Sequence, residues 1–485
     1  MSSRLIIGLS ANIAGGLVPM AVTLIVTPFY LHLIGLERFG ILSLIWLLLG
    51  YLGIFDFGFG RTVASAVARE KDEHRRADFF WTGLALSTVG GLAGALVAYG
   101  ISRFFFDQIF SVSSDLSGEI GKALLTLVAI LPLVTISSVL TGYLQGREQF
   151  GKLNIAQSAG TILFQTAPLL AGWLISVELP WLAVGALLGR LGGLLLLFAY
   201  CLSQSTEARI PRFNAADVRP MLSFGGWTMV SGIINQLMLT MDRFVIGAVS
   251  SLHAVAIYSL PYNVIIRVTL IPYSWFSVLF PRFAAAKHDD EARQILEFGS
   301  RVMFLAVTPI TVGGLVLLQP FLNLWVGREI AEQAVPPGTI LMAGFWFYAM
   351  TFMPLAFFQS RGRAGVPTIA YSIEFIVFVP LLYFSVAHAG VVGAAGAWVF
   401  RALLDGVILY WAASRATVYW KNLGLALPCL LPVSLFELLG RDLEYYGALK
   451  SVCLIWVFIY MVLILSSSER EMVVQFIKSA WRKVR

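Results

Sequence analysis

The chain has 485 residues, of which 58% are hydrophobic and only 13% are charged. Soluble domains carry about a quarter charged residues, so this composition excludes an ordinary globular protein and is typical of an integral membrane protein. The net charge of +7 would suit a nucleic-acid-binding protein, but the Lys and Arg residues are spread over short loops between apolar stretches, a pattern that sets membrane orientation instead.

Fourteen apolar stretches follow one another along the chain, each long enough to cross a bilayer. They lie at about residues 6–30, 39–60, 79–102, 121–144, 155–176, 181–202, 222–249, 256–280, 302–324, 338–358, 367–387, 393–413, 423–440 and 447–466. The first is too long for the apolar core of a cleavable signal peptide, so we expect it to be retained. When both termini are placed in the cytoplasm, most of the 34 Lys and Arg residues fall in cytoplasmic loops, which predicts that orientation. The sequence therefore predicts an all-α, multi-pass membrane protein.

The second stretch contains an ionisable residue, Asp56, among apolar neighbours. Ionisable groups inside a membrane span are costly and usually functional. We therefore take Asp56 as a candidate residue for ion coupling or gating.

The loop after the second stretch recurs after the eighth, at a constant offset of 218 residues. The matched segments are Ala66-Val67-Ala68-Arg69, Asp72-Glu73 and Arg75 in the first loop and Ala284-Ala285-Ala286-Lys287, Asp290-Glu291 and Arg293 in the second. The match continues with Gln145-Gly146-Arg147 and Gln359-Ser360-Arg361, and with Gly185 and Arg190 against Gly396 and Arg401. The chain thus contains a duplicated unit of six spans.

Because each half has an even number of spans, both halves start on the same side of the membrane and form parallel repeats related by an axis along its normal. We expect an N-terminal six-helix bundle at 1–215 and a C-terminal one at 216–421. Two further transmembrane helices follow at 422–466, and residues 467–485 have the pattern of an amphipathic helix on the cytoplasmic membrane surface.

Three arginines lie near the middle of predicted spans: Arg190, Arg267 and Arg401. Each costs roughly 2.5–3.5 kcal/mol to insert, so each should face protein or water. A guanidinium binds phosphate oxygens in a bidentate fashion, so the three predict a cationic cavity for an anionic substrate group. For Arg401 the alternative is neutralisation, because Asp405 lies four residues later on the same helix and Glu374 is also within the membrane.

Other charged residues are candidates for coupling or gating. Within or beside the spans these are Asp242, Arg243, Glu374 and Asp405, together with Asp56. We expect a cytoplasmic gate formed by Arg69, Asp72, Glu73 and Arg75 in the first repeated loop and by Lys287, Asp290, Glu291 and Arg293 in the second. Mixed charges favour ion pairs between the two loops over a pure phosphate-binding patch. The cysteines Cys201, Cys429 and Cys453 lie in apolar spans without metal-type spacing, and we expect neither a metal site nor a cofactor.

Three segments resemble the oligosaccharide flippases of the polysaccharide-transport family: GLERFGILSLIWLLLGYLGIFDFGFGRTVAS, GYLQGREQFGKLN, and GGWTMVSGIINQLMLTMDRFVIGAVSS followed by AIYSLPYNV. The family belongs to a superfamily that also holds multidrug and toxic-compound extruders and lipid II flippases. The resemblance implies two six-helix bundles in a V shape and export of undecaprenyl-diphosphate-linked oligosaccharide, an O-antigen or exopolysaccharide unit, across a bacterial inner membrane. It implies coupling to a proton or sodium gradient rather than to ATP, and the sequence has no Walker loop.

The partners that this resemblance implies are the lipid-linked substrate, membrane lipids and the polysaccharide polymerase machinery. We expect a monomer that does not bind nucleic acid. Two alternatives share the scaffold. A lipid II flippase would have the same span number, whereas a multidrug–cation antiporter predicts twelve spans and a cavity rich in carboxylates. An enzyme such as a sugar polymerase or ligase would need a large outside loop bearing catalytic groups, and the sequence has none.

Overall fold

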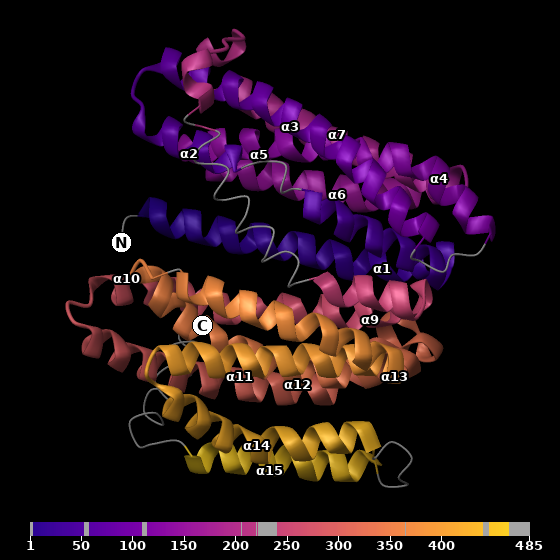
Figure 1. Ribbon diagram of the computed structural model, residues 1–485, viewed down its shortest axis with the longest axis vertical. Coiled ribbons are helices and arrows are strands. Elements are labelled where there is room, and N and C mark those ends of the chain that lie inside the picture. The colour runs from indigo at the N-terminus through magenta and orange to yellow at the C-terminus, as the bar shows by residue number, and fades with distance from the viewer. Residues whose placement is uncertain are drawn as a thin grey trace, which may run out of the picture. The chain divides into compact units, whose positions relative to one another are not determined.

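The computed structural model describes residues 3–52, 58–108, 114–204, 206–219, 221, 240–363, 365–439 and 446–464, and no strand occurs among them. Figure 1 shows the chain as a series of long helices. Asp56, most of the predicted seventh span and the predicted tail helix at 467–485 lie outside the described residues. The predicted all-α class is confirmed for the rest.

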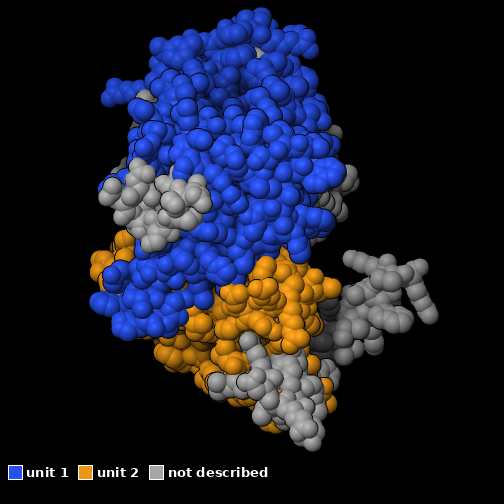
Figure 2. Space-filling view, turned by 90° about the vertical axis from the view of Figure 1, so that its right-hand side faces the viewer, with its two compact units in different colours: residues 1–260, 382–391 blue, residues 261–381, 392–485 orange. Residues whose placement is uncertain are grey.

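The chain divides into two compact units, each described here by itself (Figure 2). Unit 1 comprises Met1–Leu260 with Leu382–Val391, and unit 2 comprises Pro261–Leu381 with Val392–Arg485. The predicted limits at residues 215, 421 and 466 follow the sequence repeat rather than packing, and they stay a prediction.

The helices of the N-terminal half are α1 (Ser3–Leu52), α2 (Phe59–Arg69), α3 (Glu73–Gln108), α4 (Ser114–Val128), α5 (Ile130–Gly146), α6 (Phe150–Leu174), α7 (Leu179–Leu202) and the short 3-10 helix η2 (Glu207–Arg209). Residues 240–249 are also helical. The later helices are α9 (Leu252–Ile265), η3 (Ile266–Thr269), α10 (Leu270–Ala285), α11 (Asp289–Val326), α12 (Arg328–Ser360), α13 (Gly365–Ala412), α14 (Ala416–Leu439) and α15 (Tyr446–Ile464).

Nine helical segments of the described residues are long and apolar enough to cross a membrane, which confirms a multi-pass membrane protein. Two predicted spans are joined within α1 and two within α13, and each helix is broken at a glycine with positive φ, Gly35 (φ 75°) and Gly390 (φ 54°). Glycine takes this conformation without a steric cost, so it allows a sharp break between helices without a long loop.

The packing of α6 against α7 depends on glycines spaced four residues apart on α7. A Cβ added to Gly185 would lie 2.7 Å from the carbonyl oxygen of Ala167, and one added to Gly193 would lie 2.6 Å from Cα of Gly160. Gly189, between them, faces the backbone of Leu163 just as closely. Small residues at this spacing let two helix backbones approach, which is how helices associate in a membrane without a hydrophobic driving force.

Unit 2 packs α11, α12 and α14 around large buried side chains such as Trp346. Some of the polar atoms in this interior are paired with one another. The indole Nε1 of Trp346 donates to Oγ1 of Thr308 at 3.0 Å, and the hydroxyls of Ser300 and Tyr410 are 2.7 Å apart. Such pairing is required where no water is available to satisfy buried polar groups.

Candidate functional site

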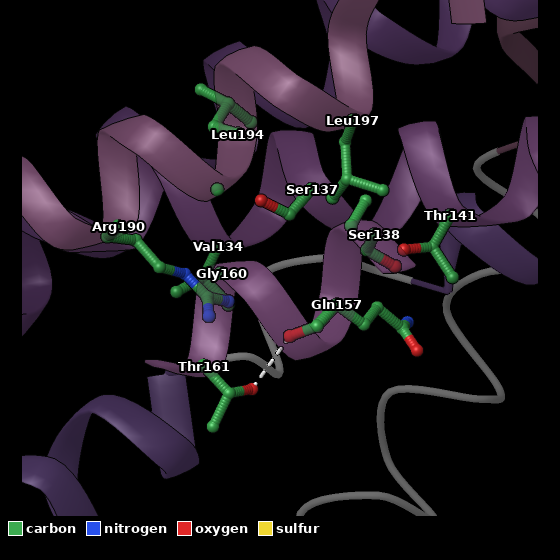
Figure 3. A pocket seen from close by; sticks show the side chains of 12 residues that line it. Val134, Ser137, Ser138, Thr141, Gln157, Gly160, Thr161, Arg190, Leu194 and Leu197 are labelled. Carbon is green, nitrogen blue, oxygen red and sulfur yellow. Dashed lines mark hydrogen bonds between the residues drawn. The ribbon is translucent and has the colours of Figure 1, made fainter. Parts of the chain in front are cut away.

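A cavity of about 410 Å³ lies within unit 1 between helices α5, α6 and α7 (Figure 3). Four residues from each helix line it: Val134, Ser137, Ser138 and Thr141 from α5, Ala156, Gln157, Gly160 and Thr161 from α6, and Arg190, Gly193, Leu194 and Leu197 from α7. The backbones of α6 and α7 are in close contact at Gly160 and Gly193, two of the residues that line the cavity.

Arg190, one of the three predicted arginines, is the only charged residue among the described residues that line the cavity. Its side chain is half-buried, and Figure 3 shows it extending from α7 toward Val134 and Gly160. The guanidinium lies 6.0 Å from the ring centroid of Phe164, and its Nε is buried with no hydrogen-bond partner among the described residues. Arg190 can therefore offer both charge and a hydrogen-bond donor to an anionic group.

The rest of the polar lining consists of hydroxyl and amide groups. The hydroxyl of Ser137 donates to the carbonyl of Leu133 at 2.6 Å, and that of Thr161 donates to the carbonyl of Gln157 at 2.9 Å. Since these protons are used within their own helices, the hydroxyl oxygens remain as acceptors toward the cavity. A lining of hydroxyls, one amide and one guanidinium suits a sugar that carries an anionic group.

Sequence reasoning found Arg190 but missed the five polar residues beside it. The signal was present, because Ser137 and Thr141, like Gln157 and Thr161, are polar residues four positions apart in apolar spans. Such pairs lie on one face of a helix.

Arg401, Glu374 and Asp405 come together in unit 2, all on α13. Their exposed fractions are 4%, 0% and 3%. Both carboxylates interact electrostatically with Arg401, whose guanidinium also lies 5.6 Å from the ring centroid of Phe378. This arrangement supports the neutralisation alternative for Arg401.

Arg267 lies on η3, a tight turn of 3-10 helix between α9 and α10, and is half-buried. A 3-10 segment in the middle of a span often marks a hinge. Arg190 belongs to unit 1 and the other two arginines to unit 2, and a cavity common to all three stays a prediction.

Asp242, a candidate for coupling, has structural partners. Its carboxylate accepts hydrogen bonds from the hydroxyl of Tyr258 at 2.7 Å and from the backbone N–H of Arg243 at 2.9 Å. It is buried, with an exposed fraction of 2%. These contacts hold the end of the helical segment 240–249 against α9.

The first repeated loop forms ion pairs inside unit 1. Glu73 contacts Arg76 at 2.8 Å and Arg147 at 2.6 Å, and Arg75 contacts Asp217 at 3.0 Å. Asp72 accepts the backbone N–H of His74 at 3.0 Å, and Arg69 is exposed at the end of α2. Beside them, the backbone N–H groups of Asp72 and Lys71 donate to Glu70 and lower the pKa of its carboxyl.

The second repeated loop forms its own contacts inside unit 2. Arg293 contacts Asp290 at 3.5 Å, and Glu291 accepts the backbone N–H of Lys287 at 2.9 Å. A shorter ion pair joins Arg361 to Asp289 at 2.7 Å. Sequence reasoning placed Arg147 and Arg361 in the repeat but did not identify them as partners of these loops, and ion pairs from one loop to the other stay a prediction.

Comparison with known proteins finds one matching family and several similar proteins. Residues 6–287 match the family described as polysaccharide biosynthesis protein. A "Putative O-antigen transporter" of Shigella flexneri is 27% identical over 412 residues, which cover 85% of this chain and 98% of that protein. An "Uncharacterized membrane protein EpsK" of Bacillus subtilis (strain 168) is 23% identical over 441 residues, covering 86% of this chain and 84% of that protein.

Solved structures show the same fold in two kinds of transporter. The lipid II flippase MurJ in an inward closed conformation matches with a TM-score of 0.70 at 14% identity, covering 96% of this chain and all of that one. An inward-facing multidrug resistance MATE family transporter of the MOP superfamily matches with a TM-score of 0.69 at 14% identity. The match covers 84% of this chain and 99% of that one. The chain therefore shares its fold with these two transporters, and the family match over residues 6–287 shows that it belongs to the polysaccharide biosynthesis protein family.

Proposed function

We propose that this protein is a flippase that moves a lipid-linked oligosaccharide from the cytoplasmic to the outer leaflet of a bacterial inner membrane. The observation that carries this proposal is the cavity with Arg190 and its hydroxyl and amide lining, inside a helical membrane unit. The family match and the resemblance to an O-antigen transporter support it.

The chemistry of such a substrate explains the lining. A diphosphate between lipid and sugar would have to cross roughly 30 Å of hydrocarbon, and an unpartnered charge makes that transfer prohibitive. Arg190 can partner the charge, while Ser137, Thr161 and Gln157 can meet sugar hydroxyls. The lipid tail stays in the bilayer during transfer. Binding has to be moderate, because a site that held the headgroup tightly would not release it.

The proposal includes features of the whole transporter. The substrate carries an undecaprenyl-diphosphate lipid, both termini are cytoplasmic, and the protein acts by alternating access as a monomer, not as an enzyme. A proton or sodium gradient drives transport without a bound cofactor. Membrane lipids surround the protein, the polysaccharide polymerase machinery receives the product, and nucleic acid is not a partner.

A lipid II flippase is the nearest alternative, since it shares the fold and would need the same charge partner. A multidrug–cation antiporter fits less well, because none of the twelve described residues that line the cavity is acidic. Deleting the gene and identifying the lipid-linked sugar that accumulates on the inner leaflet separates the first two functions. Accumulation of lipid II alone would replace the proposal by its alternative.

The site itself is tested by Arg190→Ala and Arg190→Lys in the deletion strain. We expect surface polysaccharide to be lost with Ala and partly restored with Lys, since an ammonium supplies charge without the bidentate contact. The matched control is Arg209→Ala, an exposed arginine in the same unit, which should export normally. Normal export by Arg190→Ala at the wild-type protein level would contradict the role of this cavity.

A further inference from the structure

Glu374, Arg401 and Asp405 form a buried cluster on α13, and several of its polar atoms make no hydrogen bond to the part of the chain that the structure describes. Both carboxylate oxygens of Glu374, Oδ1 of Asp405, and Nε and Nη2 of Arg401 are buried and have no hydrogen-bond partner among the described residues. Glu374 is completely buried. Buried polar atoms are nearly always paired, and each exception calls for an explanation.

The two carboxylates meet because α13 is interrupted. On one continuous helix the Cα atoms of Glu374 and Asp405 would lie roughly 45 Å apart, yet the two carboxylates are close enough to act on each other electrostatically. The break at Gly390 (φ 54°) separates the helical segment that carries Glu374 from the one that carries Arg401 and Asp405. The cluster is therefore a meeting of two spans and not a local feature of one helix.

Among the described residues, the groups that act on the carboxylates are uncharged apart from Arg401. Thr351 and Tyr348 face the cluster from α12, Tyr371 lies on α13, and Tyr419 faces it from α14. Among the described residues, Arg401 is the only cation that acts on Glu374 and Asp405.

The charges of the cluster do not balance when all three groups are ionised. Two carboxylates and one guanidinium leave one negative charge in a site without solvent, where an uncompensated charge is costly. One added proton makes the cluster neutral, and it also turns one unpartnered carboxylate oxygen into a hydrogen-bond donor. We propose that Glu374 and Asp405 together hold a single exchangeable proton, with Arg401 as the positioning residue that neutralises the remaining carboxylate.

A proton fits this site better than a metal cation. Calcium and magnesium ions need about six or more oxygen ligands, and no group of three or more His, Cys, Asp or Glu that could hold a metal occurs in the described residues. A proton bound covalently to one carboxylate needs no such set of ligands.

A proton in this place can couple a gradient to a conformational change. The protonated, neutral cluster favours a closed packing of the two spans, and loss of the proton favours a state in which water reaches the carboxylates. A ligand shifts such an equilibrium only through its differential affinity for the two states. The coupling of this proton to transport rests on the proposed flippase function. The presence of the bound proton is independent of that function.

Infrared difference spectroscopy of the purified full-length protein tests the proton directly. A protonated carboxyl group has a carbonyl stretching band that an ionised carboxylate lacks, so the wild type should show this band at neutral pH and lose it on alkaline titration. Glu374→Gln and Asp405→Asn should each abolish or shift it. The matched control is Glu437→Gln, another buried glutamate in unit 2, which should leave the band unchanged.

The proposal is overturned if the wild type shows no such band, a result that does not depend on whether any variant folds. It is also overturned if the band persists in both Glu374→Gln and Asp405→Asn, or if it disappears only in Glu437→Gln. Loss of the band on adding Na⁺ at constant pH would replace the proton by a sodium ion. Because this readout needs no substrate, its failure is distinct from failure of the flippase function.

Discussion

Arg147 and Glu73 form an ion pair of 2.6 Å between Nη1 and Oε2, and the second half of the chain has a similarly placed pair, Arg361 with Asp289 at 2.7 Å. In both halves the arginine directly follows a helix, α5 or α12, and the acid is the first residue of another helix, α3 or α11. Each pair thus connects the C-terminal end of one helix to the N-terminal end of another. This placement agrees with the helix dipoles, which favour a cation at the first end and an anion at the second.

We expect Arg147→Ala to destabilise the protein by about 1 kcal/mol, because it removes a short, partly buried pair and leaves Glu73 with Arg76 alone. Thermal unfolding of the purified protein in detergent measures the effect. Exchanging the charges in an Arg147→Glu, Glu73→Arg double variant should recover part of the loss. The control is Arg328→Ala, because the pair of Arg328 with Glu332 is highly exposed and should contribute almost nothing. Equal effects at both sites would contradict a stabilising role for the repeated pair.

Gly189→Ala should destabilise unit 1 by about 1–3 kcal/mol, because the new Cβ would collide with the backbone at Leu163 and overpacking is costly. It should also reduce export, since displacement of α7 moves the neighbouring Arg190. Gly100→Ala on α3 is the matched control, because nothing lies within 4 Å of the added Cβ. Comparison of thermal stability and export for the two variants tests whether close contact of α6 and α7 maintains the cavity. A Gly189→Ala protein as stable as the wild type would rule out that contact as a constraint.

Thr161→Val should weaken export about fivefold, the equivalent of roughly 1 kcal/mol for one lost hydrogen bond to substrate. Thr166→Val is a close control. Both hydroxyls donate to the carbonyl four residues earlier on α6, at 2.9 Å for Thr161 and 2.7 Å for Thr166, but only Thr161 lines the cavity. A difference between the two variants in initial export rate therefore reports contact with substrate and not a change in the helix. Identical rates would show that this wall does not touch the substrate.

Arg267→Ala is expected to abolish export while the protein remains folded and inserted, because a charge partner for the diphosphate would be lost. Arg267→Lys should rescue export only in part, since an ammonium cannot reproduce the bidentate contact of a guanidinium. Surface polysaccharide and the amount of membrane-inserted protein are measured in parallel. Wild-type export by the Ala variant would remove Arg267 from the transport path without affecting the role of Arg190.

The sequence by itself determined that this is a duplicated, multi-pass helical protein with arginines in its spans. The lipid or water around each residue restricts which side chains are tolerated there. The length of apolar spans, the charge of loops and an ionisable residue within a span, such as Arg190, can therefore be read directly from the sequence. The correspondence of Arg147 and Arg361 could also be read from the sequence, because the two residues occupy matching positions in the internal repeat.

Only the tertiary structure decided which charges and hydroxyls meet. Glu374 and Arg401 come together across the break at Gly390, and Arg147 reaches Glu73 from another helix. The polar cavity takes one face from each of three helices, whose approach depends on contacts such as that of Gly160 with Gly193. These relationships depend on the rotation and depth of whole helices against one another. Packing between helices sets both, and the local sequence of a single span does not contain them.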